Sequence, residues 1–134
     1  MGEVAPTRFG SARGPSLTVS LVQHSRVMVV HLAGDLEAST VPLLRQSVQP
    51  LWGRADLAAV VLDATGLGFC DSTGISALIA SLRTCQAAGK RFLLSGVHGT
   101  LARFLATTGL HRAFEICDSA DAAVRAASPG AGRA

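Results

Sequence analysis

The chain has 134 residues, enough for one domain and too few for two comfortable ones. Apolar residues make up 49% of it, so a buried core is expected, but no apolar run approaches the roughly 20 residues that cross a bilayer. The net charge is +3, yet nine basic residues stand against eight acidic ones between Ser16 and Ala127, and aromatic residues are scarce, which excludes a dedicated nucleic-acid binder.

The N-terminal half begins with a segment that shows no periodicity. Residues 1–15 are rich in Gly, Pro, Ala and Arg, so we predict a flexible tail. Leu17–Gln23 alternates apolar and polar side chains, which is typical of a half-exposed strand. After a short turn, Val27–Leu32 is nearly all apolar, which predicts a strand buried on both faces.

Helix and strand signals then alternate. Ser39 or Thr40 is expected to cap a helix that ends at Gly53, followed by a buried strand over Ala58–Leu62 and a loop over Asp63–Asp71. The strongest helix signal covers Gly74–Ala88. Arg91–Val97 is expected to be a strand, and Leu101–Leu105 marks a short helix ended by Gly109. Phe114–Ile116 is expected to be a second strand, and Asp118 or Ser119 would cap a final helix to Ala127.

This order predicts an α/β fold. Each strand after the first two returns through a helix, which implies a largely parallel sheet with one antiparallel edge pair. We expect a mixed, mostly parallel sheet of about five strands with about four helices. One domain over residues 16–127 would lie between flexible tails at residues 1–15 and 128–134.

The loop DATGLGFCDSTG, Asp63–Gly74, is the expected site because it runs from the carboxyl end of a strand into the best helix. Phe69 is expected to return the chain to the core. Ser72 would lie at the helix start, where a phosphate is tolerated and adds about −1.5 to −2 of charge, and Asp71 would sharpen its repulsion of a docked partner. The alternative interpretation is that Asp71, Ser72 and Thr73 are only a helix cap.

Three segments together resemble a STAS domain (sulfate transporter and anti-sigma factor antagonist), most closely the bacterial anti-sigma factor antagonists. They are DSTG at Asp71–Gly74, GDLEAST at Gly34–Thr40 and LARFLATTGLHRAFEI at Leu101–Ile116. They occur in the family's order within about Leu17–Ala127. The family's GELD segment reads GDLE here, so Asp35 stands where the family usually has Glu and Glu37 where it often has Asp. The exchange keeps both charges but moves them, which bears on partner specificity. The alternative for this loop is a plain helix entry.

The resemblance implies a binding module and not an enzyme. Such an antagonist binds an anti-sigma factor, often a Ser/Thr kinase, frees a sigma factor, and loses the complex when the kinase phosphorylates the serine after Asp. That serine is Ser72 here, with Thr73 as a weaker acceptor, and a phosphatase would restore the active form. No cofactor is implied, since ATP and metal belong to the kinase. The implied partner-binding residues are Asp35, Glu37, Ser39, Thr40, Asp71, Ser72, Thr73 and Gly74.

Other chemistry is weakly supported. Cys70, Cys85 and Cys117 form no CxxC pair and no metal-ligand spacing with histidine, so we expect reduced, mostly buried thiols. His31 is expected to be a satisfied core histidine. Gly66-Leu67-Gly68 lacks the lysine of a phosphate-binding loop, and Ser72 is not in a G-x-S-x-G turn.

Two functions stay open at this point. The first is the phosphorylation-switched antagonist, and the alternative is a non-switching STAS scaffold or accessory subunit of a transport or signalling complex. Met1–Ser16 has no apolar block of the kind a signal peptide needs, so a cytoplasmic protein is expected, as a monomer or weak dimer without direct nucleic-acid or membrane binding.

Overall fold

Six strands form one mixed sheet in the computed structural model, which describes the backbone of residues 3–10 and residues 14–128 with their side chains. The strands lie in the sheet in chain order: β1 (Glu3–Gly10), β2 (Ser16–His24), β3 (Val27–Leu36), β4 (Ala59–Cys70), β5 (Arg91–Ser95) and β6 (Glu115–Cys117). The pairs β1/β2 and β2/β3 are antiparallel, and the three later pairs are parallel.

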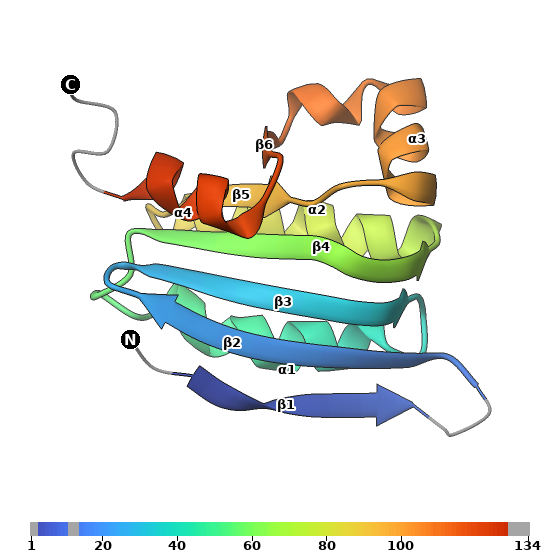
Figure 1. Ribbon diagram of the computed structural model, residues 1–134, viewed down its shortest axis with the longest axis horizontal. Coiled ribbons are helices and arrows are strands. Elements are labelled where there is room, and N and C mark those ends of the chain that lie inside the picture. The colour runs from blue at the N-terminus through green and yellow to red at the C-terminus, as the bar shows by residue number, and fades with distance from the viewer. Residues whose placement is uncertain (1–2, 11–13, 129–134) are drawn as a thin grey trace.

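Four helices cover the two faces of this sheet: α1 (Val41–Trp52), α2 (Ser72–Ala87), α3 (Gly99–Thr108) and α4 (Ala120–Ala127). A single 3-10 turn, η1 (Leu110–Arg112), follows α3. In Figure 1, α1 and α2 lie behind the sheet and α4 lies in front of it. The predicted α/β fold with four helices and a mixed sheet is therefore confirmed.

Strand β3 explains why the sheet is covered on both faces. Its Met28 and Val30 belong to the larger core cluster, which also contains residues of α1, α2 and α3. Its Val27 and Val29 belong to a smaller cluster with Ala123 of α4. Alternate side chains of a strand point to opposite faces, so a run of apolar residues supplies both cores.

The loop predicted over Asp63–Asp71 is wrong, since most of this segment is strand. β4 continues to Cys70 and pairs with the second half of β3, with register shifts between His31 and Ala33 and between Gly34 and Asp35. A Cβ at Gly66 would lie 2.7 Å from the Leu32 carbonyl oxygen. The glycine therefore permits a close approach of the two strands at an irregularity of the ladder, where the sequence suggested a turn.

The flexible tail predicted over residues 1–15 is also wrong in part, since Glu3–Gly10 forms β1 at the edge of the sheet. The register with β2 shifts between Val4 and Thr7, the stretch that contains Pro6. Proline is tolerated on an edge strand because one side of its backbone needs no ladder partner, so its presence was weak evidence against a strand. Most of the predicted C-terminal tail, residues 129–134, lies outside the described residues.

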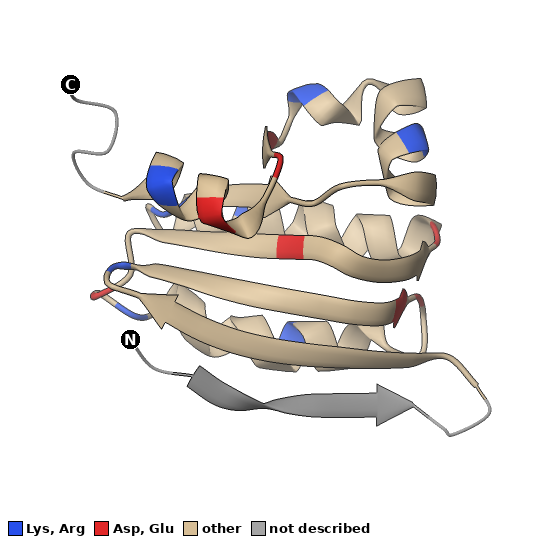
Figure 2. Cartoon of the chain, in the orientation of Figure 1, with Lys and Arg blue, Asp and Glu red and all other residues tan. Residues whose placement is uncertain are grey.

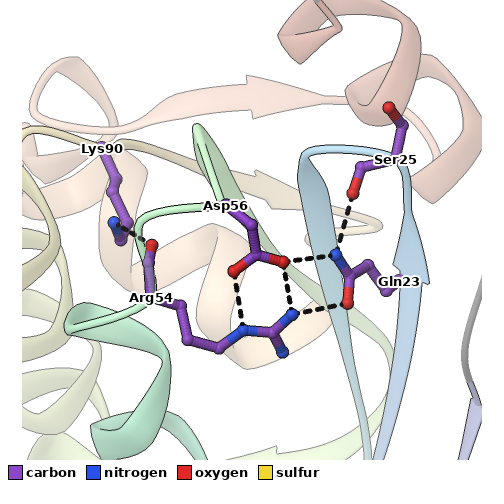
Figure 3. Close-up of polar contacts among 5 residues, drawn as sticks. All are labelled: Gln23, Ser25, Arg54, Asp56 and Lys90. Carbon is purple, nitrogen blue, oxygen red and sulfur yellow. Dashed lines mark hydrogen bonds and ion pairs between the residues drawn. The ribbon is translucent and has the colours of Figure 1, made fainter.

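A polar network fastens the end of the sheet at which the parallel strands begin (Figure 3). Arg54, in the loop after α1, donates from Nε and a terminal nitrogen to the two carboxylate oxygens of Asp56, at 3.0 and 2.6 Å. Gln23 of β2 accepts from Arg54 and donates to Asp56 and to the Ser25 carbonyl. The buried Lys90 donates its Nζ to the Arg54 carbonyl at 2.7 Å. The network therefore joins the β2–β3 hairpin, the α1–β4 loop and the start of β5.

We expect the Asp56 carboxylate to titrate near pH 2, because the hydrogen bonds from Arg54 and then Gln23 hold its pKa at about 2, well below the usual value. Because the folded-state pKa is lowered, the contribution of this pair to stability is present above about pH 4 and is lost as the pH falls through about 2. The pKa of Asp56 is measured by carboxyl-carbon NMR in wild type, in Arg54→Ala and in the exposed control Arg45→Ala. A wild-type midpoint near 4, or one that Arg54→Ala leaves in place, would contradict the assignment.

Candidate functional site

The carboxyl ends of β3 and β4 bring together two segments that lie far apart in the sequence. Leu36 at the end of β3 pairs with Cys70 at the end of β4. The N–H of Asp71 donates to the Leu36 carbonyl at 3.3 Å. The loop over residues 37–40 therefore lies beside the start of α2, at the edge where parallel strands usually carry functional loops.

Helix α2 begins at Ser72, and Asp71 is its N-cap. The Asp71 side chain accepts from the N–H of Gly74 at 2.9 Å, and its carbonyl accepts from the N–H of Ile75. Ser72 and Thr73 are exposed, and neither makes a side-chain hydrogen bond within the described part of the chain. The cap interpretation therefore holds for Asp71, while both hydroxyl groups remain accessible from solvent.

The loop that leaves β3 is held by its own side chains. The Glu37 carboxylate accepts from the N–H and the hydroxyl of Ser39. The Thr40 hydroxyl donates to the Asp35 carbonyl at 2.7 Å and accepts from the N–H of Glu37 at 3.0 Å. The Asp35 carboxylate accepts from the N–H of Ser16 at 3.2 Å, which ties the loop to β2. These bonds keep the loop in one shape beside α2.

Burial divides the eight candidate residues into three groups. Ser39, Ser72 and Thr73 are exposed. The three carboxylate residues Asp35, Glu37 and Asp71 are partly exposed. Figure 2 shows acidic residues where β3 and β4 end. Thr40 and Gly74 are buried, Thr40 completely, so the prediction that they contact a partner is corrected: Thr40 closes the loop and Gly74 packs against β3.

Phe69 lies outside the core, contrary to the sequence-based expectation. Phe69 is 47% exposed, while the nearby Leu67 and Cys70 are buried. The irregular end of the β3–β4 ladder breaks strict alternation, so two consecutive residues, Gly68 and Phe69, face solvent. Sequence reasoning missed this residue because a phenylalanine near a buried strand normally indicates the core.

The family model described as the STAS domain matches residues 18–123. The chain belongs to the STAS domain family. The resemblance based on the DSTG, GDLEAST and LARFLATTGLHRAFEI segments is thereby confirmed.

Similar proteins of this family include anti-sigma factor antagonists. The anti-sigma F factor antagonist of Paenibacillus polymyxa is 24% identical over 104 residues, which cover 78% of this chain and 89% of that protein. The crystal structure of an anti-sigma factor antagonist from Mycobacterium paratuberculosis has a TM-score of 0.74 at 24% identity and covers 83% of this chain and 93% of its own. The Bacillus cell fate determinant SpoIIAA in its phosphorylated form has a TM-score of 0.64 at 19% identity, covering 81% and 98%. At these identities the structures share the fold.

Three other kinds of feature were sought in the described part of the STAS domain: a metal site, a membrane-spanning helix and a phosphate-binding loop. The described residues contain no group of three or more His, Cys, Asp or Glu side chains able to hold a metal ion. Nor does any helix within residues 14–128 have the length and apolar content needed to cross a membrane. Gly66 and Gly68 lie within β4 and do not open a helix, so they do not form a phosphate-binding loop.

The thiols of the STAS domain are free. Cys70 and Cys85 are buried as predicted, and Cys117 is partly buried. Burial raises the pKa of the Cys70 thiol to about 11, and the nearby Asp71 carboxylate adds to the shift. Burial likewise raises the pKa of Cys85 to about 11. Thiolate is the reactive form, so neither cysteine is suited to nucleophilic or redox chemistry.

His31 belongs to a polar cluster on the α4 face of the sheet. Its Nδ1 lies 2.8 Å from the Asp63 carboxylate, which also accepts from Thr65 and Ser95. The His31 side chain is 39% exposed, so it has the expected polar partner but is not a core residue. Asp63 and Ser95 are the buried members of this cluster.

Proposed function

We propose that this STAS domain is an anti-sigma factor antagonist, switched off by phosphorylation of Ser72. In the unmodified state it binds an anti-sigma factor, a protein kinase in this proposal, and so releases a sigma factor. A phosphatase returns the modified protein to the binding state. The names of the Paenibacillus and Mycobacterium proteins support the antagonist role, and the phosphorylated Bacillus structure supports the modification.

The observation that carries this proposal is the exposed hydroxyl group of Ser72 at the first residue of α2. Asp71 already supplies the capping oxygen, so the serine side chain is free to enter a kinase active site without disturbing the helix. The helix N-terminus tolerates the new charge because its free N–H groups and dipole favour anions. Modification would therefore change the surface more than the fold.

The carboxylates around Ser72 explain why a phosphate would end binding. Asp71 precedes it directly, and Asp35 and Glu37 lie at the neighbouring strand end. A phosphoserine adds about −1.5 to −2 of charge to this group. A partner surface that complements three carboxylates and a neutral hydroxyl would meet both a larger charge and a larger group, which raises the dissociation rate of the complex.

The phosphorylation test needs the kinase that co-purifies with the chain from its host, together with ATP. We expect intact-protein mass spectrometry to show the addition of one phosphoryl group to wild type and to Thr73→Ala, and none to Ser72→Ala, because only Ser72 is expected to align with the kinase. Thr73 is the matched control, since it is also exposed and lies one residue away.

Two results would count against the switch. One is an unchanged mass of the wild type after incubation with the active kinase. The other is equal modification of the wild type and Ser72→Ala, which would move the acceptor to another residue. A chain that still binds the anti-sigma factor but is never modified would be a non-switching STAS subunit.

A further inference from the structure

Phe69 is the most exposed large apolar side chain in the described part of the chain. Only Phe69, at 47%, and Ile116, at 41%, are large hydrophobic residues with this exposure among residues 14–128. Phe69 closely precedes Ser72, whereas Ile116 lies in β6 at the far edge of the sheet. A single exposed apolar side chain is ordinary, so its surroundings decide whether it has a role.

A small pocket of about 120 Å³ opens beside Phe69, between the end of β4 and the start of α3. Its lining includes the buried apolar residues Ala64, Leu67 and Leu101 and the exposed polar residues His98, Thr100 and Arg103. Sites for small organic ligands occupy about 300–1,000 Å³. The pocket is therefore too small for a nucleotide and has the size of one aliphatic side chain.

Charge separates this pocket from the rest of the edge. No acidic residue lines it, and one of its lining residues is the exposed Arg103 of α3. Within residues 14–128, Arg103 makes one weak contact, from its guanidinium to the Thr100 hydroxyl at 3.3 Å, which leaves its other N–H donors for a partner. Asp35 and Glu37 lie instead at the end of β3, where the chain leads into α1. A protein docked over Ser72 would thus meet acids on one flank and an arginine beside an apolar pocket on the other.

We propose that Phe69 and this pocket anchor the anti-sigma factor: an aliphatic side chain of that protein enters the pocket against the Phe69 ring, and an adjacent carboxylate pairs with Arg103. This inference rests on the proposed function and adds the second contact region of the same partner. Arginine and aromatic residues are typical energetic centres of protein interfaces, and a pocket that takes one side chain gives such a centre its specificity.

The experiment uses the anti-sigma factor that co-purifies from the host, expressed and purified, and measures its affinity by calorimetry for the full chain and its variants. We expect Phe69→Ala to weaken binding about 10- to 30-fold and Arg103→Glu to weaken it at least about tenfold. The matched controls Ile116→Ala and Arg125→Glu, which change the same residue types away from Ser72, are expected to bind like wild type. Thermal unfolding of each variant verifies that the fold is intact.

The Ser72→Asp variant separates the two proposals. If it loses affinity while Phe69→Ala binds as tightly as Ile116→Ala, the anchor is wrong and the proposed function stands. If the wild type binds no anti-sigma factor, both are wrong. A loss of affinity confined to Phe69→Ala, Arg103→Glu and Ser72→Asp supports both.

Discussion

Replacing Gly74 with alanine is expected to lower the free energy of unfolding by about 1–3 kcal/mol, because α2 starts directly against the backbone of β3. A Cβ atom at this position would lie 2.4 Å from the Leu36 carbonyl oxygen and 3.0 Å from the Cys70 Sγ. A backbone oxygen cannot rotate away, so the first turn of α2 must move. Alanine's better helix propensity, worth about 1 kcal/mol, offsets only part of this cost. Thermal unfolding should show a melting temperature lower by roughly 4–10 °C.

Gly53→Ala is the matched control for this substitution. Gly53 ends α1 at an ordinary φ of −89°, and nothing lies within 4 Å of a Cβ built there. The variant should therefore keep or slightly raise the melting temperature, since alanine restricts the unfolded chain. Equal melting temperatures for Gly74→Ala and Gly53→Ala would mean that the contact between α2 and β3 relaxes without cost. The glycine of the DSTG segment would then need another explanation.

Patterns of apolar side chains predicted most of the fold. The alternation in Leu17–Gln23 and the apolar run in Val27–Leu32 indicated β2 and β3, and the spacing of Ile75, Leu78 and Leu82 indicated α2. These patterns are reliable because burying an apolar face is what stabilises each element. The sequence did not predict strand β1 or the second half of β4. Pro6 and Gly66 are typical of tails and turns, but proline also occurs on edge strands and glycine where two strands approach closely.

The candidate site was predicted in position but not in burial. The resemblance to the STAS family grouped the loop after β3 with Ser72, and the structure brings that loop beside the start of α2, where the parallel strands β3 and β4 end. Sequence could not show that the Thr40 hydroxyl turns inward to the Asp35 carbonyl, or that Phe69 turns outward. Both depend on how two loops and an irregular ladder pack together, which is a tertiary property without a local signal.

Asp63→Ala is expected to destabilise the domain by about 2–4 kcal/mol, since this buried carboxylate holds several donors at the centre of the sheet. One of its oxygens accepts from the Thr65 hydroxyl at 2.7 Å and from the fully buried Ser95 hydroxyl at 3.1 Å, and the other lies 2.8 Å from the His31 Nδ1. Without the carboxylate, the Ser95 hydroxyl would be left in the interior with no acceptor. Urea unfolding measures the loss, and the exposed Asp118→Ala should change stability by less than about 0.5 kcal/mol.

We expect the charged form of Asp63 to be the one that stabilises the sheet, which a pH series can test. Burial acts to raise the pKa of Asp63, but hydrogen bonds from the Thr65 hydroxyl, His31, the Thr65 N–H and Ser95 outweigh it and hold the pKa below the usual value. A group with a lowered folded-state pKa stabilises the protein above its unfolded pKa of about 3.9, and this contribution disappears as the pH falls through the folded-state value. The stability of wild type relative to Asp63→Asn should therefore decrease as the pH falls below about 4. A difference that stays the same in acid would mean that the shape of the side chain, and not its charge, stabilises the sheet.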